Sequence, residues 1–248
     1  MDSLASFEKR FHLGTSECDI NGQWMLRSLL EMAQNTANEH SAALHLWHDD
    51  LIEQDLSWVL FKTDLYVDRY PRLGECVTVR TFTKGARSMF CPRYYLVTDA
   101  RGALIARIGS LLMLMDRTTR KAVSPAERGI VLPDAEEEVP PVKISMGVKS
   151  LSGEEKRFRY QPQYADIDIN GHVNNVRYAD WLCNRLGIEI MRQYEISFAA
   201  IDYRHEVVPE IPMEMILTRS DDAFQFSGNA EDRQLFSIYG QLRARSVH

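Results

Sequence analysis

The sequence predicts an α+β fold that is built twice along the chain, and three observations support this prediction. First, the pentapeptide Asp168-Ile169-Asn170-Gly171-His172 repeats Asp19-Ile20-Asn21-Gly22-Gln23, with His in place of Gln as the one difference. Second, each pentapeptide precedes a segment in which apolar residues have helical spacing. Third, each helical segment precedes strand-like runs separated by turns. Because the order of elements recurs as well as the pentapeptide, we interpret the chain as a tandem duplication.

The first half begins with a long predicted helix. Apolar residues recur at helical spacing between Trp24 and Leu46, and Asp19 or Asn21 is placed to cap the helix start. Four runs rich in Val, Thr, Phe, Tyr and Leu follow, with turn residues between them, which predicts an antiparallel meander. These runs are Ser57 to Val67, Glu75 to Lys84, Met89 to Asp99 and Ala103 to Asp116.

The second half repeats this plan after a polar connection. The stretch from Leu132 to Glu155 collects prolines and acidic residues, which is typical of a surface linker. We therefore expect an N-terminal domain at 1–132, a linker at 133–155 and a C-terminal domain at 156–248, with each sheet burying one face on its own helix. The elements expected after the linker are a strand Arg157 to Tyr164, a helix Val173 to Ile190, and strands Ser197 to Val207, Met213 to Arg219, Ala223 to Asn229 and Leu235 to Arg245.

Composition restricts the classes of function. A chain of 248 residues with 45% hydrophobic residues is long enough for two small domains with real cores. The net charge of -6 argues against a nucleic-acid partner, because such proteins neutralise phosphates with Lys and Arg. The most apolar stretch, Ala103 to Met115, is too short to span a bilayer, so we expect no membrane span. The four cysteines, Cys18, Cys76, Cys91 and Cys183, form no zinc-site or disulfide pattern, so we expect a location in the reducing cytoplasm.

The second pentapeptide is the candidate site. Asp168, Asn170 and His172 occupy alternate positions, so an extended backbone would place the three side chains on one side. A helix N-terminus beside them would add amide donors and partial positive charge, which suit a developing oxyanion. The same pattern also serves as a turn and helix cap, so both interpretations stay open for these residues taken alone. His172 is the one member that a turn does not require.

The segment Asp166 to Tyr178, with Trp181 beyond it, resembles the signature of the acyl-acyl-carrier-protein (acyl-ACP) thioesterases. Members of that family are tandem hotdog proteins that release fatty acids from carrier protein. The resemblance extends over the whole chain, and the segment Ile201 to Glu206 is similar to the family's downstream motif around a catalytic Glu. It implies a double hotdog fold, each hotdog with a long central helix wrapped by an antiparallel sheet, and a catalytic C-terminal domain. It also implies a set of active-site residues, namely Asp168, Asn170, His172 and Glu206.

Two positions depart from the plant members of this family. Gly171 stands where those members usually have Gln, and Val207 stands where they have a Cys once considered the nucleophile. Because valine cannot attack a thioester, a covalent mechanism at that position is excluded. Cys183 is interpreted as a buried structural thiol of the second helix. We therefore expect direct hydrolysis by water.

The four site residues receive different expected roles. Asn170 and the helix amides would polarise the thioester carbonyl, while His172 and Glu206 would hold and deprotonate the water. Asp168 would orient Asn170 or His172. The sequence does not decide whether His172 or Glu206 is the proximal base.

The first half is expected to have lost catalysis, because Gln23 replaces His172. Alignment of Pro71 with Pro209 assigns Asp68 to the place of Glu206. The resemblance implies that the acyl chain runs into this domain, so some of its apolar side chains should line the tunnel. The candidates are Met25, Met32, Trp58, Met89, Leu112, Met113, Leu114 and Met115.

The partners implied by the resemblance are acyl carrier protein and a fatty acyl chain. The 4′-phosphopantetheine arm belongs to the substrate, and no metal or other cofactor is expected. Carrier protein is acidic, so a basic docking surface is expected near the mouth of the site. Its candidates are Lys149, Lys156, Arg157, Arg159 and Arg177.

Three other functions remain as alternatives. Single-hotdog acyl-CoA thioesterases share part of the His172 motif, whereas hotdog dehydratases use His with a carboxylate in a different arrangement. A non-catalytic acyl-chain binding protein is the alternative from another class, and the intact His172 and Glu206 argue against it. Oligomeric state stays open, with a homodimer as one alternative, because the duplication already supplies two hotdog units.

Overall fold

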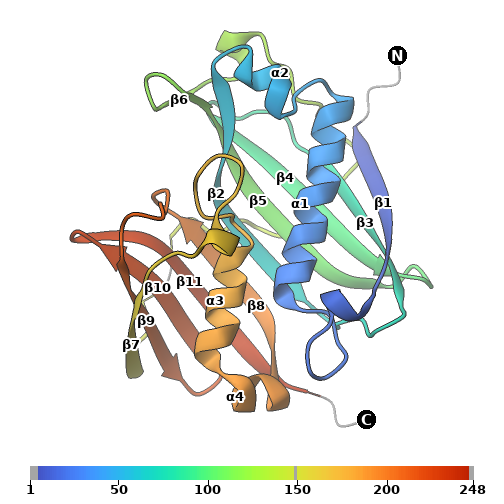
Figure 1. Cartoon of the computed structure of the whole chain (residues 1–248). Coiled ribbons are helices and arrows are strands. Elements are labelled where there is room, and N and C mark those ends of the chain that lie inside the picture. Colours follow the sequence, from blue (N-terminus) through green and yellow to red (C-terminus); the bar gives the residue numbers. More distant parts are fainter. Residues whose placement is uncertain (1–4, 148–149, 246–248) are drawn as a thin grey trace.

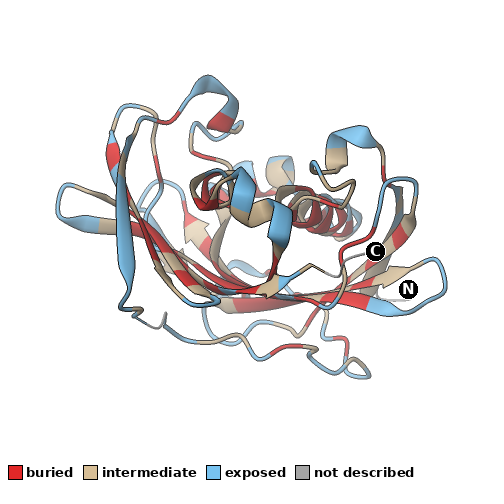
Figure 2. Cartoon of the chain, turned by 90° about the horizontal axis from the view of Figure 1, so that it is seen from below, coloured by how far each residue is buried: buried red, intermediate tan, exposed pale blue. Residues whose placement is uncertain are grey.

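The computed structural model describes residues 5–147 and 150–245. Within this part of the chain one continuous antiparallel sheet curves around two helices that lie side by side on its concave face (Figure 1). From one edge of the sheet to the other the strands are β1 (Ser6–His12), β3 (Cys76–Thr83), β4 (Phe90–Asp99), β5 (Leu104–Asp116), β2 (Leu56–Val67), β8 (Tyr194–Tyr203), β11 (Arg233–Ala244), β10 (Ala223–Ala230), β9 (Met213–Ser220) and β7 (Glu154–Tyr160), and β6 (Lys121–Val123) pairs with β5. The predicted α+β arrangement, built twice, is confirmed. Figure 2 shows the helices enclosed by the curved sheet, with buried residues on the surfaces that face each other.

The first repeat follows the predicted order of elements. Its long helix α1 turns Leu29 and Ala33 toward the sheet, and both are buried. The strand β1 was not predicted, because its seven residues include three consecutive charged residues, Glu8 to Arg10, and show no alternation of apolar and polar side chains. It pairs with β3 at the edge of the sheet. The elements are β1 (Ser6–His12), α1 (Leu26–Ala43), α2 (His48–Ile52), β2 (Leu56–Val67), β3 (Cys76–Thr83), β4 (Phe90–Asp99), β5 (Leu104–Asp116) and β6 (Lys121–Val123).

The second repeat differs from the prediction in its helix. The helix expected from Val173 to Ile190 begins only at Arg177, because Val173 forms a β-bridge with Ile167. It also breaks at Gly187, whose φ of 89° lies in the region that favours glycine. The elements are β7 (Glu154–Tyr160), α3 (Arg177–Leu186), α4 (Ile188–Gln193), β8 (Tyr194–Tyr203), β9 (Met213–Ser220), β10 (Ala223–Ala230) and β11 (Arg233–Ala244).

The two sheets expected from the sequence are joined into one. β2 and β8 pair in antiparallel register from Lys62 opposite Asp202 to Tyr66 opposite Phe198. Each strand would otherwise leave a row of unpaired backbone groups at an edge, so the pairing satisfies both. One hydrophobic core, in which α1 and α3 both take part, runs through the two repeats.

The connection between the two repeats packs on the sheet. It ends where β7 begins at Glu154, which lies inside the segment 133–155 expected as linker. Val142 and Ile144 lie over Gly109 of β5, where an added Cβ would come within 2.5 Å of Val142. The backbone amide and hydroxyl of Ser145 donate to Asp64 Oδ2 at 2.8 and 2.7 Å. The connection is therefore attached to the first repeat by side-chain contacts.

Candidate active site

The pentapeptide before α3 forms a closed turn that fixes the backbone of His172. Asp168 Oδ1 accepts the amide of Asn170 at 2.8 Å, and the amide of Asp168 donates to the carbonyl of His172 at 2.8 Å. Gly171 has a φ of 79°, which a residue with a side chain rarely adopts. Asp168 thus fixes the backbone of Asn170. The candidate site residues Asp168, Asn170 and His172 are therefore also members of a turn.

Glu206 is brought to this turn by the segment that follows β8. The expected strand end at Val207 is wrong, because β8 ends at Tyr203 and the chain turns there. The amide of Val173 then donates to the carbonyl of Val207 at 2.9 Å, which holds the two segments together. As a result His172 Nε2 lies 3.3 Å from Glu206 Oε2, and both side chains are about one-third exposed, at 30% and 34%.

A third charged residue, Arg120, contacts Glu206 and was missed by the sequence analysis. It comes from the turn between β5 and β6 in the first repeat, and its Nη2 donates to Glu206 Oε2. Burial raises the pKa of Glu206, but the hydrogen bond from Arg120 and the charges of His172 and Arg120 outweigh it, so this pKa lies below its ordinary value. Glu206 is therefore ionised near neutral pH.

Two backbone amides at the start of α3 donate hydrogen bonds to Asn174 and are therefore not free to bind an oxyanion. Asn174 Oδ1 accepts the amide of Val176 at 3.2 Å, and the carbonyl of Asn174 accepts the amide of Arg177 at 2.9 Å. The expectation that amides directly after the pentapeptide face an oxyanion is wrong at these two positions, because the helix starts later than expected. The Asn170 side chain remains as a donor on the same wall.

A cavity of about 1740 Å³ begins at this pair and extends into the first repeat. Asp168, Asn170, His172 and Glu206 all line it, so the structure brings the four candidate residues to one cavity. On the side of the first repeat it is lined by α1, β2 and β5. Among the tunnel candidates Trp58, Leu112, Met113 and Met115 line it, and the residues outside the lining are Met25, Met32, Met89 and Leu114.

Comparison with known proteins identifies the family. A family model described as the acyl-ACP thioesterase N-terminal domain matches residues 5–128, and the acyl-ACP thioesterase C-terminal domain matches residues 149–238. The chain belongs to the acyl-ACP thioesterase family. These two matches confirm the family expected from the resemblance. The double hotdog fold is confirmed because solved structures of acyl-ACP thioesterases superpose over almost the whole chain.

An acyl-ACP thioesterase from Bacteroides thetaiotaomicron has a TM-score of 0.85 at 21% identity, over 98% of this chain and 100% of that one. The 12:0-ACP thioesterase from Umbellularia californica has a TM-score of 0.80 at 20% identity, over 97% and 98%. A chloroplastic acyl-[acyl-carrier-protein] hydrolase of Cuphea viscosissima is 26% identical over 213 residues, 81% of this chain and 52% of that protein. The chain spans about half the length of the curated relatives it matches.

The basic residues expected to dock the carrier are mostly occupied by carboxylates. Arg157 Nη1 lies 2.8 Å from Glu214 Oε2, Lys156 Nζ lies 3.5 Å from Glu154 Oε1, and Arg177 pairs with Asp180. Arg159 lies on β7 at the edge of the sheet, and Lys149 lies outside the described residues. Their charge is therefore less available to an acidic partner than the sequence suggests.

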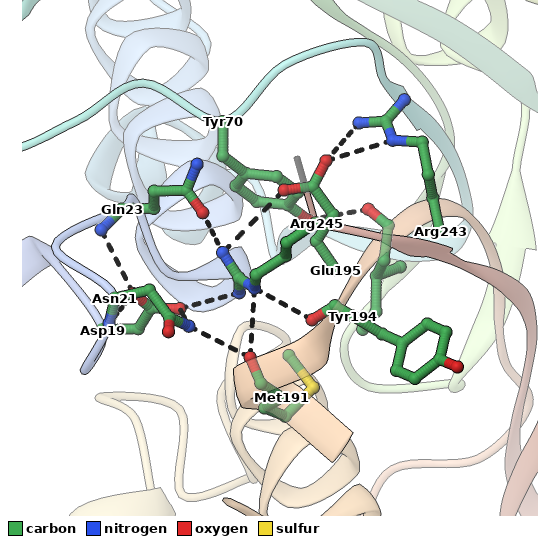
Figure 3. Close-up of polar contacts among 10 residues, drawn as sticks. Asp19, Asn21, Gln23, Tyr70, Met191, Tyr194, Glu195, Arg243 and Arg245 are labelled. Carbon is green, nitrogen blue, oxygen red and sulfur yellow. Dashed lines mark hydrogen bonds and ion pairs between the residues drawn. The ribbon is translucent and has the colours of Figure 1, made fainter. Parts of the chain in front are cut away.

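The first copy of the pentapeptide forms the same turn but is occupied by Arg245 (Figure 3). Arg245 Nη2 lies 2.8 Å from Asp19 Oδ2, and its Nη1 donates to Gln23 Oε1. Asn21 Nδ2 donates to the carbonyl of Met191 at 3.0 Å. The first copy of the turn thus contacts Arg245, which follows β11, and Met191 of α4.

The counterpart of Glu206 is Tyr70, so the assignment of Asp68 is wrong. The amide of Trp24 donates to the carbonyl of Pro71 in the way that the amide of Val173 donates to the carbonyl of Val207. Pro71 is therefore equivalent to Val207, and Tyr70, the residue before Pro71, is equivalent to Glu206. The alignment of Pro71 with Pro209 is wrong by two residues, because Pro209 lies two residues beyond Val207, the position equivalent to Pro71. Tyr70 is buried, with its hydroxyl donating to the carbonyl of Ile196, and cannot act as a carboxylate base.

The described residues contain no group of three His, Cys, Asp or Glu side chains able to hold a metal ion. They also contain no helix that is both long and apolar enough to cross a membrane.

All four cysteines are free, and burial raises the pKa of Cys183 to about 12.

Proposed function

We propose that the protein hydrolyses fatty acyl-ACP thioesters to free fatty acid and carrier thiol by direct attack of water. The observation that carries this proposal is the His172–Glu206 pair at one end of a cavity of about 1740 Å³. A cavity of this size fits a long acyl chain, and the pair supplies the base that thioester hydrolysis needs. The proposed division of the chain is 1–132 for acyl binding, 133–155 as linker and 156–248 for catalysis.

The geometry favours His172 as the base. An ionised carboxylate accepts hydrogen bonds only, so His172 carries its hydrogen on Nε2, toward Glu206 Oε2. The other ring nitrogen, Nδ1, is then the acceptor that takes a proton from water. Glu206 holds this tautomer and stabilises the imidazolium that forms. A carboxylate has the same role in other enzymes in which it accepts a hydrogen bond from a histidine base.

The remaining steps follow from this assignment. The hydroxide adds to the thioester carbonyl, and the Asn170 amide donates to the oxyanion of the tetrahedral intermediate. The C–S bond then breaks, and the imidazolium of His172 returns the proton to the departing thiolate. Water has been added across the bond, giving a carboxylic acid and a thiol. Asp168 keeps Asn170 in place through the backbone hydrogen bond at 2.8 Å.

The test is thiol release from acyl-ACP and acyl-CoA substrates of graded chain length, with His172→Ala and Glu206→Gln in parallel. We expect turnover on carrier-bound substrates, with losses of roughly 100-fold or more in both variants. A preference for acyl-CoA would instead make this an acyl-CoA thioesterase. Tight binding of fatty acid without turnover by the unmodified protein would indicate an acyl-chain binding protein.

The four free cysteines fit a reducing compartment, so a cytoplasmic location is part of the proposal.

A further inference from the structure

We propose that Arg120 of the first repeat is a positioning residue of the active site, which orients Glu206 so that Glu206 can hold His172. The inference rests on the proposed function. It gives the non-catalytic repeat a direct part in the reaction, besides lining the acyl cavity.

The contacts of Glu206 carry the first step. Arg120 Nη2 donates to Glu206 Oε2, and the same oxygen lies 3.3 Å from His172 Nε2. Two donors from different repeats thus converge on one carboxylate oxygen. Because a carboxylate on an exposed segment can rotate freely, a guanidinium that holds it from the other repeat restricts it to the orientation that contacts His172.

The turn that carries Arg120 is built to present this side chain. Asp116 Oδ1 accepts the amide and the hydroxyl of Thr119 at 2.8 and 2.9 Å, and Asp116 Oδ2 accepts Arg128 Nη2 at 2.6 Å. The amide of Arg120 donates to the carbonyl of Asp116 at 2.9 Å. Arg120 itself has a φ of 57°, a region where Gly or Asn is usual. These contacts fix the backbone from which the Arg120 side chain reaches Glu206.

The charges around Glu206 set the expected pH dependence. Arg120 faces it from the β5–β6 turn, His172 from the turn before α3, and the buried Tyr178 from α3 itself. Arg120 contributes to the lowered pKa of Glu206. Without Arg120 the carboxylate would take up a proton at a higher pH, and protonated Glu206 no longer stabilises the imidazolium of His172. The acid limb of the pH profile would therefore move to higher pH.

The test compares Arg120→Gln and Arg120→Lys with a matched control, Lys121→Gln, which removes a positive charge one residue away and outside the cavity lining. For Arg120→Gln we expect kcat on acyl-ACP to fall roughly tenfold or more with KM little changed, and the acid limb to shift upward. Arg120→Lys should recover part of kcat and of the profile. Lys121→Gln should keep both, and thermal unfolding of all variants shows that they are folded.

Coupling to Glu206 provides the second arm of the test. Arg120→Gln should have little further effect in a Glu206→Gln background, because both substitutions remove one interaction. Unchanged kcat and pH profile in Arg120→Gln, a change in KM alone, or losses that simply add would overturn the inference. The proposed function is judged separately, since wild-type turnover and its loss in His172→Ala do not depend on these outcomes.

Discussion

Arg245 Nη2 lies 2.8 Å from Asp19 Oδ2, so a hydrogen bond joins residues 226 positions apart in the chain. Arg245 is 12% exposed and Asp19 19%, and the same guanidinium donates to the carbonyls of Met191 and Tyr194 at 3.1 and 3.0 Å. The turn that resembles the candidate site thus forms a contact between the two repeats (Figure 3). The duplicated motif keeps its fold while its polar groups take on a structural role.

Removing this contact should destabilise the protein. Arg245→Met leaves the partly buried Asp19 without its cation, and we expect a loss of about 2–3 kcal/mol in the free energy of unfolding. For a chain of this size the loss corresponds to a Tm lowered by roughly 5–10 °C. Denaturant unfolding measures it. Arg192→Met is the control, because Arg192 is 58% exposed and its partner Glu189 is 79% exposed, so the substitution should cost less than about 1 kcal/mol. Equal losses in the two variants would contradict the assigned role of Arg245.

Restoring histidine to the first repeat should not restore catalysis. In the variant His172→Ala/Gln23→His the new imidazole would face Tyr70 and Arg245, and no carboxylate occupies the place of Glu206. Turnover of acyl-ACP by the double variant should equal that of His172→Ala within about twofold. Recovery of ten percent or more of wild-type kcat would show that the first site needs only its histidine.

The sequence predicts the elements that depend on local pattern. Helical spacing predicts α1, and alternation and turn residues predict most strands. The motif proposes His172 and Glu206 as site residues, and the structure places these two side chains 3.3 Å apart. The contacts of Arg120 with Glu206 and of Arg245 with Asp19 join residues 86 and 226 positions apart, so they depend on how the repeats pack. The pairing of β2 with β8 could not be predicted from local sequence pattern for the same reason. The late start of α3 follows from the β-bridge between Val173 and Ile167. The apolar residues have helical spacing from Val173 onward, so the spacing alone does not show that the helix begins only at Arg177.

Cys183 should be dispensable for turnover. It lies on α3 outside the cavity lining, and burial, with the charges of Asp180 and Asp19, raises the pKa of its thiol to about 12. At pH 8 almost none of it is the reactive thiolate. We expect Cys183→Ala to keep kcat within about twofold. A loss of 100-fold in a folded variant would require a covalent mechanism.

Asp64 makes the stability of the protein depend on pH. It is 1% exposed, and burial raises its pKa, although the hydrogen bonds from Ser145 and the charge of Lys62 act in the opposite direction and the charge of Asp202 adds to the increase. A carboxyl group whose pKa is raised by folding contributes most below its unfolded pKa of about 3.9, and the contribution is lost as the pH rises through the folded pKa.

Asp64→Asn removes this titration and keeps an oxygen that accepts the Ser145 hydrogen bonds. We expect the stability of the variant relative to wild type to increase between pH 4 and pH 8. Urea unfolding at several pH values measures the difference. A difference that is constant over this range would show that Asp64 is ionised in the folded protein throughout.

Ala37 should control the length of acyl chain that the cavity accepts. It lies on α1 and lines the cavity, so Ala37→Phe fills space that the distal methylenes would occupy. Exclusion of two or three methylenes costs about 2 kcal/mol, or roughly a 30-fold loss of kcat/KM on the longest substrates, while shorter substrates keep their rate. The acyl-ACP panel measures this shift. Ala42→Phe is the matched control, because Ala42 lies on the same helix, exposed and outside the lining. If both variants keep the wild-type length profile, the acyl chain does not pass Ala37, and the part of the cavity beside α1 serves another purpose.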